Sequence, residues 1–194
     1  MFLNWNKLLI LVISMEFEGV IKTRASIRDY SDKPVEDEKI NFVLECARLA
    51  PSWANRQCWH FIVVKDKKSI EELSKTSIIN RWLKAVPVII VACGDPQKSG
   101  SRNGIDYFIV DVSIALENLV LGATSEGLGT CWIGGFDEKK VKEILLIPDG
   151  IRVVALTPLG YPSEKNRLVG KLIKFVTQGK KRKSLDKIVH ENKW

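Results

Sequence analysis

Two arginines and a serine alternate near the start of the chain, at Arg24, Ser26 and Arg28. If this segment is extended, the three side chains point to the same side. Two guanidinium groups flanking a hydroxyl suit a phosphate, because each guanidinium can donate two parallel hydrogen bonds to phosphate oxygens. Arginines at this spacing are also common on ordinary protein surfaces, so the pattern leaves both interpretations open.

A polar loop from residue 52 to residue 59 supplies a second group of candidate ligands. It combines a serine, an asparagine and a glutamine with two tryptophans. Hydroxyl and amide side chains held in a loop can bind the hydroxyls or the heterocycle edge of a small molecule.

A glycine pair, Gly134 and Gly135, follows a β-branched and aromatic run at residues 130–133. Glycine lets the backbone approach a flat or anionic ligand closely. A strand that ends in a turn explains the same residues without a ligand, and this stretch alone favours that simpler explanation.

The net charge of +7 raises the question of a nucleic-acid partner. Much of the excess lies between Lys165 and Lys187, and a local basic cluster is usually a solvated face and less often grips phosphate. No RNA-binding aromatic pair or zinc finger accompanies it, so we expect no nucleic-acid partner.

The sequence does not indicate a catalytic centre or a metal site formed by side chains. The four cysteines are far apart without a C-x-x-C pair, and only His60 and His190 could join them. Neither a zinc site nor a disulfide framework is suggested, and reduced thiols indicate a cytoplasmic protein. The chain also has no G-x-S-x-G motif and no recognisable nucleophile–base pair.

A helix at residues 107–123 is the element around which the other segments are organised. It is apolar on nearly every side, which is typical of a buried helix. Its polar residues Asp111, Asn118 and Ser125 recur seven apart in one narrow stripe, which argues against a membrane span. Gly127 is well placed to end the helix in a left-handed conformation.

Periodicity predicts the remaining elements of one domain at residues 15–194. Helices are expected at 16–23, 36–49, 69–74, 138–145 and 185–192, and strands at 61–64, 87–93, 130–133 and 152–159, the last broken at Pro158. Alternating strands and helices suggest an α/β class. Residues 1–14 precede Met15 as a leader, either disordered or the product of a mis-set start codon.

Five motifs in a fixed order resemble the FMN-dependent nitroreductase family, in register from about Met15 to Trp194. They are Arg24-x-Ser26-x-Arg28, Ala50-Pro51-Ser52-x-x-Asn55-x-Gln57-x-Trp59, Gly127-Leu128-Gly129-Thr130-Cys131-Trp132-Ile133-Gly134, Leu159-Gly160-Tyr161-Pro162 and Arg182-Lys183-x-Leu185. The resemblance implies an α+β fold in place of α/β. The expected fold is a three-layer sandwich with a mostly antiparallel central sheet flanked by helices, in an intertwined homodimer whose central helices pack together.

The resemblance also implies an FMN site at each side of the subunit interface. The phosphate would be held by the first motif and the tail, through Arg24, Ala25, Ser26, Arg28, Lys180 and Arg182. The other subunit would place Pro51, Ser52, Trp53 and Asn55 beside the ring and ribityl chain. Ile133, Gly134 and Gly135 would lie under the isoalloxazine, and Asn80 would reach its pyrimidine edge.

Two departures from the family pattern bear on substrate choice. Cys58 stands where proline commonly precedes the tryptophan, so the loop has more freedom. The segment between Cys93 and Tyr107 is too short for the helical insertion that covers the pocket in larger members.

The implied activity is a ping-pong transfer of hydride from NAD(P)H to flavin N5 and then to a small-molecule electron acceptor over the same face. Nitroaromatics, quinones and similar conjugated electrophiles are the expected acceptors, and the cofactor carries the chemistry, with no catalytic side chain. Two alternatives stay open: a flavin store or sensor without turnover, and a flavin-dependent dehalogenase or fragmentation enzyme of the same family. Neither a membrane nor a metal is expected.

Overall fold

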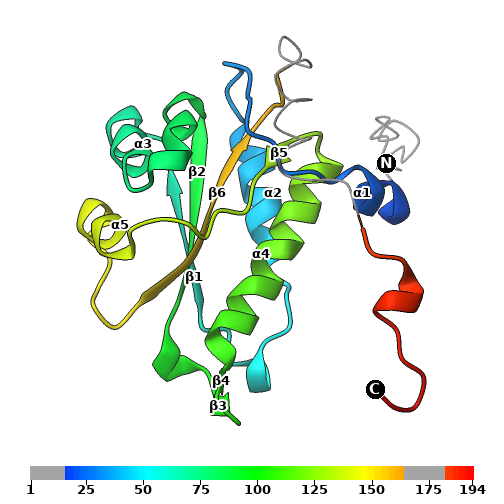
Figure 1. The fold of residues 1–194 in the computed structure, drawn as a ribbon. Helices are drawn as coiled ribbons and strands as arrows, with labels where there is room; N and C mark the ends of the chain where they lie inside the picture. The colour runs from blue at the N-terminus through cyan, green and yellow to red at the C-terminus, as the bar shows by residue number, and fades with distance from the viewer. Residues whose placement is uncertain (1–15, 164–181) are drawn as a thin grey trace, which may run out of the picture.

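A four-stranded sheet lies at the centre of the computed structural model, which describes residues 16–163 and 182–194 (Figure 1). Its order is β1 (Trp59–Val64), β2 (Val88–Gly94), β6 (Arg152–Gly160) and β5 (Gly129–Thr130). Each pair of neighbouring strands is antiparallel. The expected antiparallel sheet is confirmed, and the α/β interpretation was wrong because helix–strand alternation does not determine strand direction.

Helices cover both faces of this sheet, which gives the expected three layers (Figure 1). On one face lie α2 (Asp37–Arg48) and α4 (Tyr107–Ser125), and on the other α3 (Lys67–Ser74), α5 (Glu138–Leu145) and the 3₁₀ segment η3 (Ile78–Ala85). Strand β2 is buried along its whole length. Its alternate residues enter two separate cores: Val88, Ile90 and Ala92 pack toward α2 and α4, and Ile89, Val91 and Cys93 toward α3 and α5.

Helix α4 is long and apolar enough to cross a membrane, but half of it is buried inside the fold as a core helix. It packs so closely on α2 that a methyl group at Gly122 would lie 2.7 Å from the Cys46 sulfur. Gly127 ends the helix with φ of 72°, as predicted from the glycine preference of this position.

Strand β6 runs through Pro158, so the predicted break at this residue was wrong. Leu156 exchanges backbone hydrogen bonds with Ile133 on the β5 side of the strand. Because successive residues alternate, the nitrogen of Pro158 also faces that side, and pairing with β2 needs no N–H there. Beside the proline, the Cys131 N–H donates to the Thr157 hydroxyl instead, at 3.2 Å.

The predicted strand at residues 130–133 is shorter than expected. Only Gly129–Thr130 form β5, and Ile133 contributes an isolated bridge to Leu156. A separate hairpin joins β3 (Ser101–Arg102) to β4 (Ile105–Asp106), and short 3₁₀ turns occur at η2 (Trp53–Asn55) and η4 (Pro96–Lys98).

Both ends of the described chain lie outside α4, on the side away from the sheet (Figure 1). Helix α1 (Phe17–Thr23) confirms the first predicted helix. The helix expected at 185–192 was wrong: only η5 (Leu185–Lys187) is present, and every residue of 182–194 is exposed. Short helices without a packed face are marginal in water, which accounts for the difference. The expected leader, residues 1–14, lies outside the described residues.

Candidate functional site

The Arg24–Arg28 segment is extended and runs alongside β5. Ile27 donates its backbone N–H to the Thr130 carbonyl at 2.8 Å, and Ser26 forms a parallel bridge with Thr130. The contact is tight, since a methyl group at Gly129 would lie 2.8 Å from the Ile27 side chain. The alternation predicted for this segment therefore places Arg24, Ser26 and Arg28 together on one side of an extended strand-like stretch.

The Cys131 thiol, which follows β5, has all three of these side chains as neighbours. Burial raises the pKa of Cys131, and three neighbours oppose the rise: the charge of Arg28, a hydrogen bond with Ser26 and the charge of Arg24. Arg24, Ser26 and Arg28 thus all lie near the Cys131 thiol, next to β5. The half-buried arginines have the chemistry to hold a phosphate there.

The glycine pair lies a few residues further along the same stretch. Gly134 and Gly135 are exposed, and a methyl group built on either would meet nothing within 4 Å. Within residues 16–163 and 182–194, no group accepts a hydrogen bond from either N–H. The backbone here is open to a flat ligand, which is the property that the glycine pair suggested.

Asn80 reaches this stretch from η3. Its buried side-chain amide donates to the Gly135 carbonyl at 3.0 Å. Asn80 therefore joins the glycine pair, as a contact that holds the backbone of Gly135 in place.

The polar loop has an unusual backbone. Ala54, Asn55 and Gln57 adopt φ of 46°, 56° and 48°, a region that costs free energy for residues other than glycine. Two contacts inside the loop close it: Gln57 N–H donates to Ser52 Oγ at 2.9 Å, and the Gln57 amide donates to Asn55 Oδ1 at 3.0 Å. Pro51 and Asn55 are exposed at its surface.

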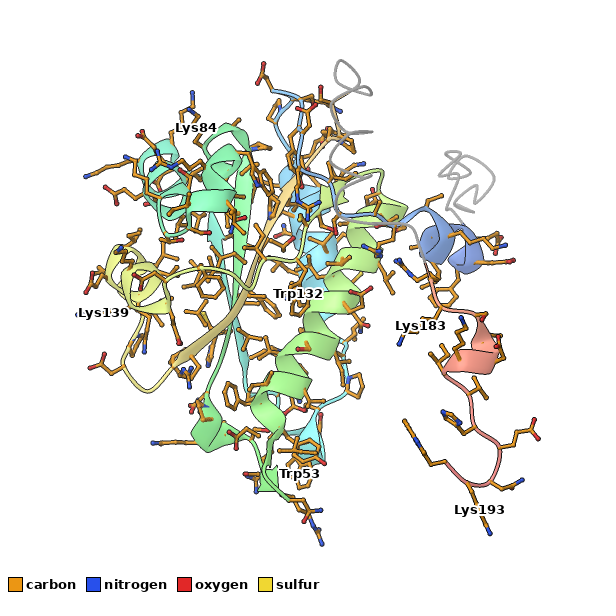
Figure 2. The ribbon with its side chains drawn as sticks, viewed as in Figure 1. Trp53, Lys84, Trp132, Lys139, Lys183 and Lys193 are labelled. Atoms are coloured by element: carbon orange, nitrogen blue, oxygen red, sulfur yellow. The ribbon has the colours of Figure 1, made fainter. Side chains whose placement is uncertain are left out.

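The fold brings together only part of the predicted site. Figure 2 places Trp53 of the loop at one end of α4 and Trp132, next to Ile133, beside the middle of the helix. We call the first group the loop half-site (Pro51, Ser52, Trp53 and Asn55) and the second the strand half-site (Arg24, Ala25, Ser26, Arg28, Asn80, Ile133, Gly134 and Gly135). Within one chain these two half-sites are separate.

The 182–194 segment begins beside α1 and runs along the side of α4 that faces away from the sheet (Figure 1). Arg182 is exposed at the start of this segment. Lys180, the other predicted phosphate ligand, lies outside the described residues.

Asp111 is a residue of the site region that the sequence did not single out. It was grouped with Asn118 and Ser125 as a polar stripe, yet its carboxylate accepts the backbone N–H of Trp53 at 2.8 Å. The sequence did contain a signal for this role, because Asp111 is the one acidic residue in the first half of an apolar helix. A carboxylate buried there needs several hydrogen-bond donors.

Comparison with known proteins identifies the family. Residues 21–79 and 71–161 match the model of the nitroreductase family. A protein of Archaeoglobus fulgidus, provisionally named NADH dehydrogenase/NAD(P)H nitroreductase, is 39% identical over 150 residues, which cover 75% of this chain and 85% of that protein. The chain belongs to the nitroreductase family.

Solved structures of family members share the fold. A nitroreductase family protein from Clostridium novyi has 41% identity and a TM-score of 0.75, covering 77% of this chain and 87% of that one. An FMN-dependent nitroreductase from Clostridium difficile has 33% identity and a TM-score of 0.74, covering 91% of this chain and 99% of that one. These relatives support an oxidoreductase of the nitroreductase family, with the fold that the sequence motifs implied.

Proposed function

We propose that this protein is an FMN-dependent oxidoreductase that passes hydride or electrons from NAD(P)H to a nitroaromatic, a quinone or a similar conjugated electrophile. It would act as an intertwined homodimer in the cytoplasm, by a ping-pong mechanism. The names of two relatives support the cofactor and the reductant: one is an FMN-dependent nitroreductase, and the other is named for NAD(P)H.

The separation of the two half-sites is the observation that carries this proposal. The loop, rich in hydroxyl and amide groups, lies with Trp53 at one end of α4, whereas Trp132, which precedes the glycine pair, lies beside the middle of the helix (Figure 2). A second copy of the chain, packed on the same helix, can bring its loop half-site to the first copy's strand half-site. Two equivalent sites then follow from twofold symmetry.

The surface of α4 suits such a partner. Ile109, Val110 and Ile114 are 47, 37 and 37% exposed on this helix, and Phe42 and Leu49 of the neighbouring α2 region are 44 and 65% exposed. Apolar side chains gathered on one helical layer are typical of a protein interface. The exposed tail, which carries Leu185, Ile188 and Val189, offers a further apolar segment for the partner.

The residues present fit FMN. Its phosphate matches the cluster of Arg24, Ser26 and Arg28, whose charges and hydroxyl oppose the rise that burial causes in the pKa of Cys131. Its flat ring matches the open backbone at Gly134 and Gly135. Arg182 and Lys180 would add charge from the tail.

In this mechanism FMN, when bound, supplies the hydride and electron transfer. The chain itself holds and orients the cofactor. Arginines would neutralise the phosphate, and the backbone N–H groups of Gly134 and Gly135, unpaired within the described residues, could donate hydrogen bonds to the ring and stabilise negative charge there. The neighbouring thiol of Cys131 stays protonated, because burial raises its pKa. It is not poised to act as a nucleophile.

The visible spectrum of the purified protein tests the cofactor and the reductant together. We expect flavin absorption that bleaches on anaerobic addition of NADH or NADPH and returns on addition of a quinone. A flavin that binds but does not turn over would favour the store or sensor. A colourless protein that takes up no added FMN would overturn the assignment of both half-sites, and a polyanion could then be tested on the basic tail.

Complementation between variants tests the shared site. One variant carries Arg24→Ala and Arg28→Ala, and the other carries Ser52→Ala and Asn55→Gly. Glycine is used at position 55 because it removes the side chain and still tolerates the positive φ of this residue. Random assembly of the co-expressed chains gives heterodimers with one intact site, so about a quarter of all sites should bind FMN. If each chain formed its whole site alone, co-expression would restore no binding.

A further inference from the structure

The carboxylate of Asp111 connects the central helix to the polar loop. Asp111 lies in the first half of α4 and is 2% exposed. Its Oδ1 accepts the backbone N–H of Trp53 at 2.8 Å, and its Oδ2 accepts the Ser99 hydroxyl at 2.8 Å. The buried Cys58 thiol lies 3.5 Å from the same Oδ2.

These contacts join three segments that are distant in the sequence. Trp53 opens the loop, Cys58 closes it, and Ser99 belongs to the turn that follows η4. The thiol acts as a donor, because burial and the adjacent carboxylate raise the pKa of Cys58 to about 11. One buried side chain therefore ties both ends of the loop to the helix.

The Trp53 side chain is held from two other directions. Its indole lies against Gly100, where a methyl group would come within 2.4 Å of the indole nitrogen. Its ring centroid is 4.1 Å from that of Tyr107, the first residue of α4. Figure 2 places Trp53 at this end of the helix, below the sheet.

Between these anchors the backbone is strained. Ala54, Asn55 and Gln57 have positive φ, and such a conformation persists only where the surroundings enforce it. Two internal hydrogen bonds of Gln57 shape the loop, but neither attaches it to the rest of the fold. The loop's closest hydrogen bonds to α4 go to Asp111, beside the ring contact of Trp53 with Tyr107.

We propose that Asp111 is a positioning residue, which fixes the loop half-site in the conformation that receives the cofactor. This inference rests on the proposed function, in which Pro51, Ser52 and Asn55 contact FMN bound to the other subunit. Because Asp111 lies on the helix that would also face the partner, it sets the loop relative to the dimer interface. Its carboxylate contacts the loop backbone and takes no part in the chemistry.

Asp111→Leu is the informative variant, since leucine has a similar shape but accepts no hydrogen bond. In this buried position it leaves the Trp53 N–H and the Ser99 hydroxyl without their acceptor, so thermal stability should fall. Hydrogen exchange in peptides covering residues 52–58 should also become about tenfold faster or more, because the Trp53 N–H loses its acceptor. Peptides from β2 should keep the wild-type rate.

Two further variants separate positioning from stability. Asp111→Asn retains an oxygen for the Trp53 N–H, so exchange in the loop should stay within about threefold of wild type. Leu116 is fully buried on the same helix, more than one turn from Asp111. Leu116→Ala should lower thermal stability without a local change at residues 52–58.

FMN titration of the same four proteins completes the test. Asp111→Leu should raise the Kd for FMN about tenfold or more, whereas Asp111→Asn and Leu116→Ala should remain within about threefold. Wild-type FMN affinity in Asp111→Leu would overturn the inference and leave the proposed function intact. Unchanged loop exchange in that variant would also overturn it. If the wild type itself binds no FMN, the proposed function fails and the positioning role fails with it.

Discussion

The side-chain amide of Asn80 donates a 3.0 Å hydrogen bond to the carbonyl oxygen of Gly135, 55 residues further along the chain. This contact links η3, which leads into β2, to the exposed glycine pair. A residue expected at the edge of the cofactor thus also holds the backbone on which the ring would lie.

Asn80→Ala should therefore weaken both stability and FMN binding. A lost hydrogen bond costs about 0.5–1.5 kcal/mol, which lowers the melting temperature of a domain of this size by roughly 1–6 °C. Thermal unfolding with and without FMN measures the two effects. Asn41→Ala, on the exposed side of α2, is the matched control and should change neither. Unaltered FMN affinity in Asn80→Ala would contradict the predicted link to the ring site.

Gly129→Ala should displace the phosphate ligands. The added methyl group would lie 2.8 Å from Ile27, too close for an ordinary contact, so the Arg24–Arg28 segment must move away from β5. We expect at least about a tenfold loss of FMN affinity by titration, since charge-assisted hydrogen bonds contribute roughly 1.5–3 kcal/mol each. Gly150→Ala, where a methyl group meets nothing within 4 Å, serves as the control. Equal affinity in the two variants would place the phosphate elsewhere.

Arg182→Ala should weaken FMN retention while leaving the unfolding transition of the apoprotein nearly unchanged, because the residue is exposed. Loss of one phosphate contact costs roughly 1.5–3 kcal/mol, or about tenfold to a hundredfold in Kd. Lys193→Ala removes a cation from the same exposed segment and should have little effect. Similar losses in both variants would indicate a general charge effect rather than a specific contact.

Gly122→Ala tests the close packing of α2 on α4. Alanine favours the helix over glycine by about 1 kcal/mol, but the methyl group would lie 2.7 Å from the Cys46 sulfur, and overpacking costs about 1–3 kcal/mol. We expect a net loss of unfolding free energy, measured with urea. Adding Cys46→Ala removes the sulfur and should recover most of that loss. A double variant no more stable than Gly122→Ala would rule out this contact as the cause.

Acid should weaken a contact at the end of β6. The Tyr161 hydroxyl donates to Glu36 Oε2 at 2.6 Å and Lys33 lies 3.2 Å from Oε1. Together with a backbone hydrogen bond, these partners lower the pKa of Glu36 to about 2. Because the pKa of Glu36 is lower in the folded than in the unfolded protein, its ionised carboxylate stabilises the fold fully at pH values above the unfolded pKa of about 4.3. This stabilisation is lost as the pH falls through the folded pKa of about 2.

Urea unfolding of the wild type and Tyr161→Phe between pH 6 and pH 2 measures this contribution. The wild type should be more stable at pH 6, and the difference should shrink toward pH 2. In a Glu36→Gln background, Tyr161→Phe should have the same effect at every pH. A pH-independent difference in the original background would exclude the carboxylate as the partner that matters.

Local sequence determined most of the helices and the family. Residues 37–48 and 138–145 form helices where apolar spacing predicted them, and the glycine at 127 ends α4 as expected. These features depend on neighbours within a few residues, which the sequence contains directly. The five ordered motifs likewise identified the nitroreductase family, which the family match confirms.

The local pattern of residues did not determine strand direction or the path of the chain at Pro158. The alternation of elements suggested an α/β class, only the family resemblance implied an antiparallel sheet, and the proline suggested a break. Antiparallel pairing with β2 and the orientation of the Pro158 nitrogen away from β2 depend on which strands become neighbours. Pairing between strands some 70 residues apart has no local pattern in the sequence.

The site shows the same division. The sequence identified the arginines, the polar loop and the glycine pair by their residue types and spacing. Only the folded chain placed the loop and the glycine pair in separate regions along α4, and brought Asn80 to Gly135 and Asp111 to Trp53. In each of these contacts a side chain meets a backbone group 55 or more residues away. Their formation depends on how the helices pack on the sheet, and the spacing of residues within a motif does not specify that packing.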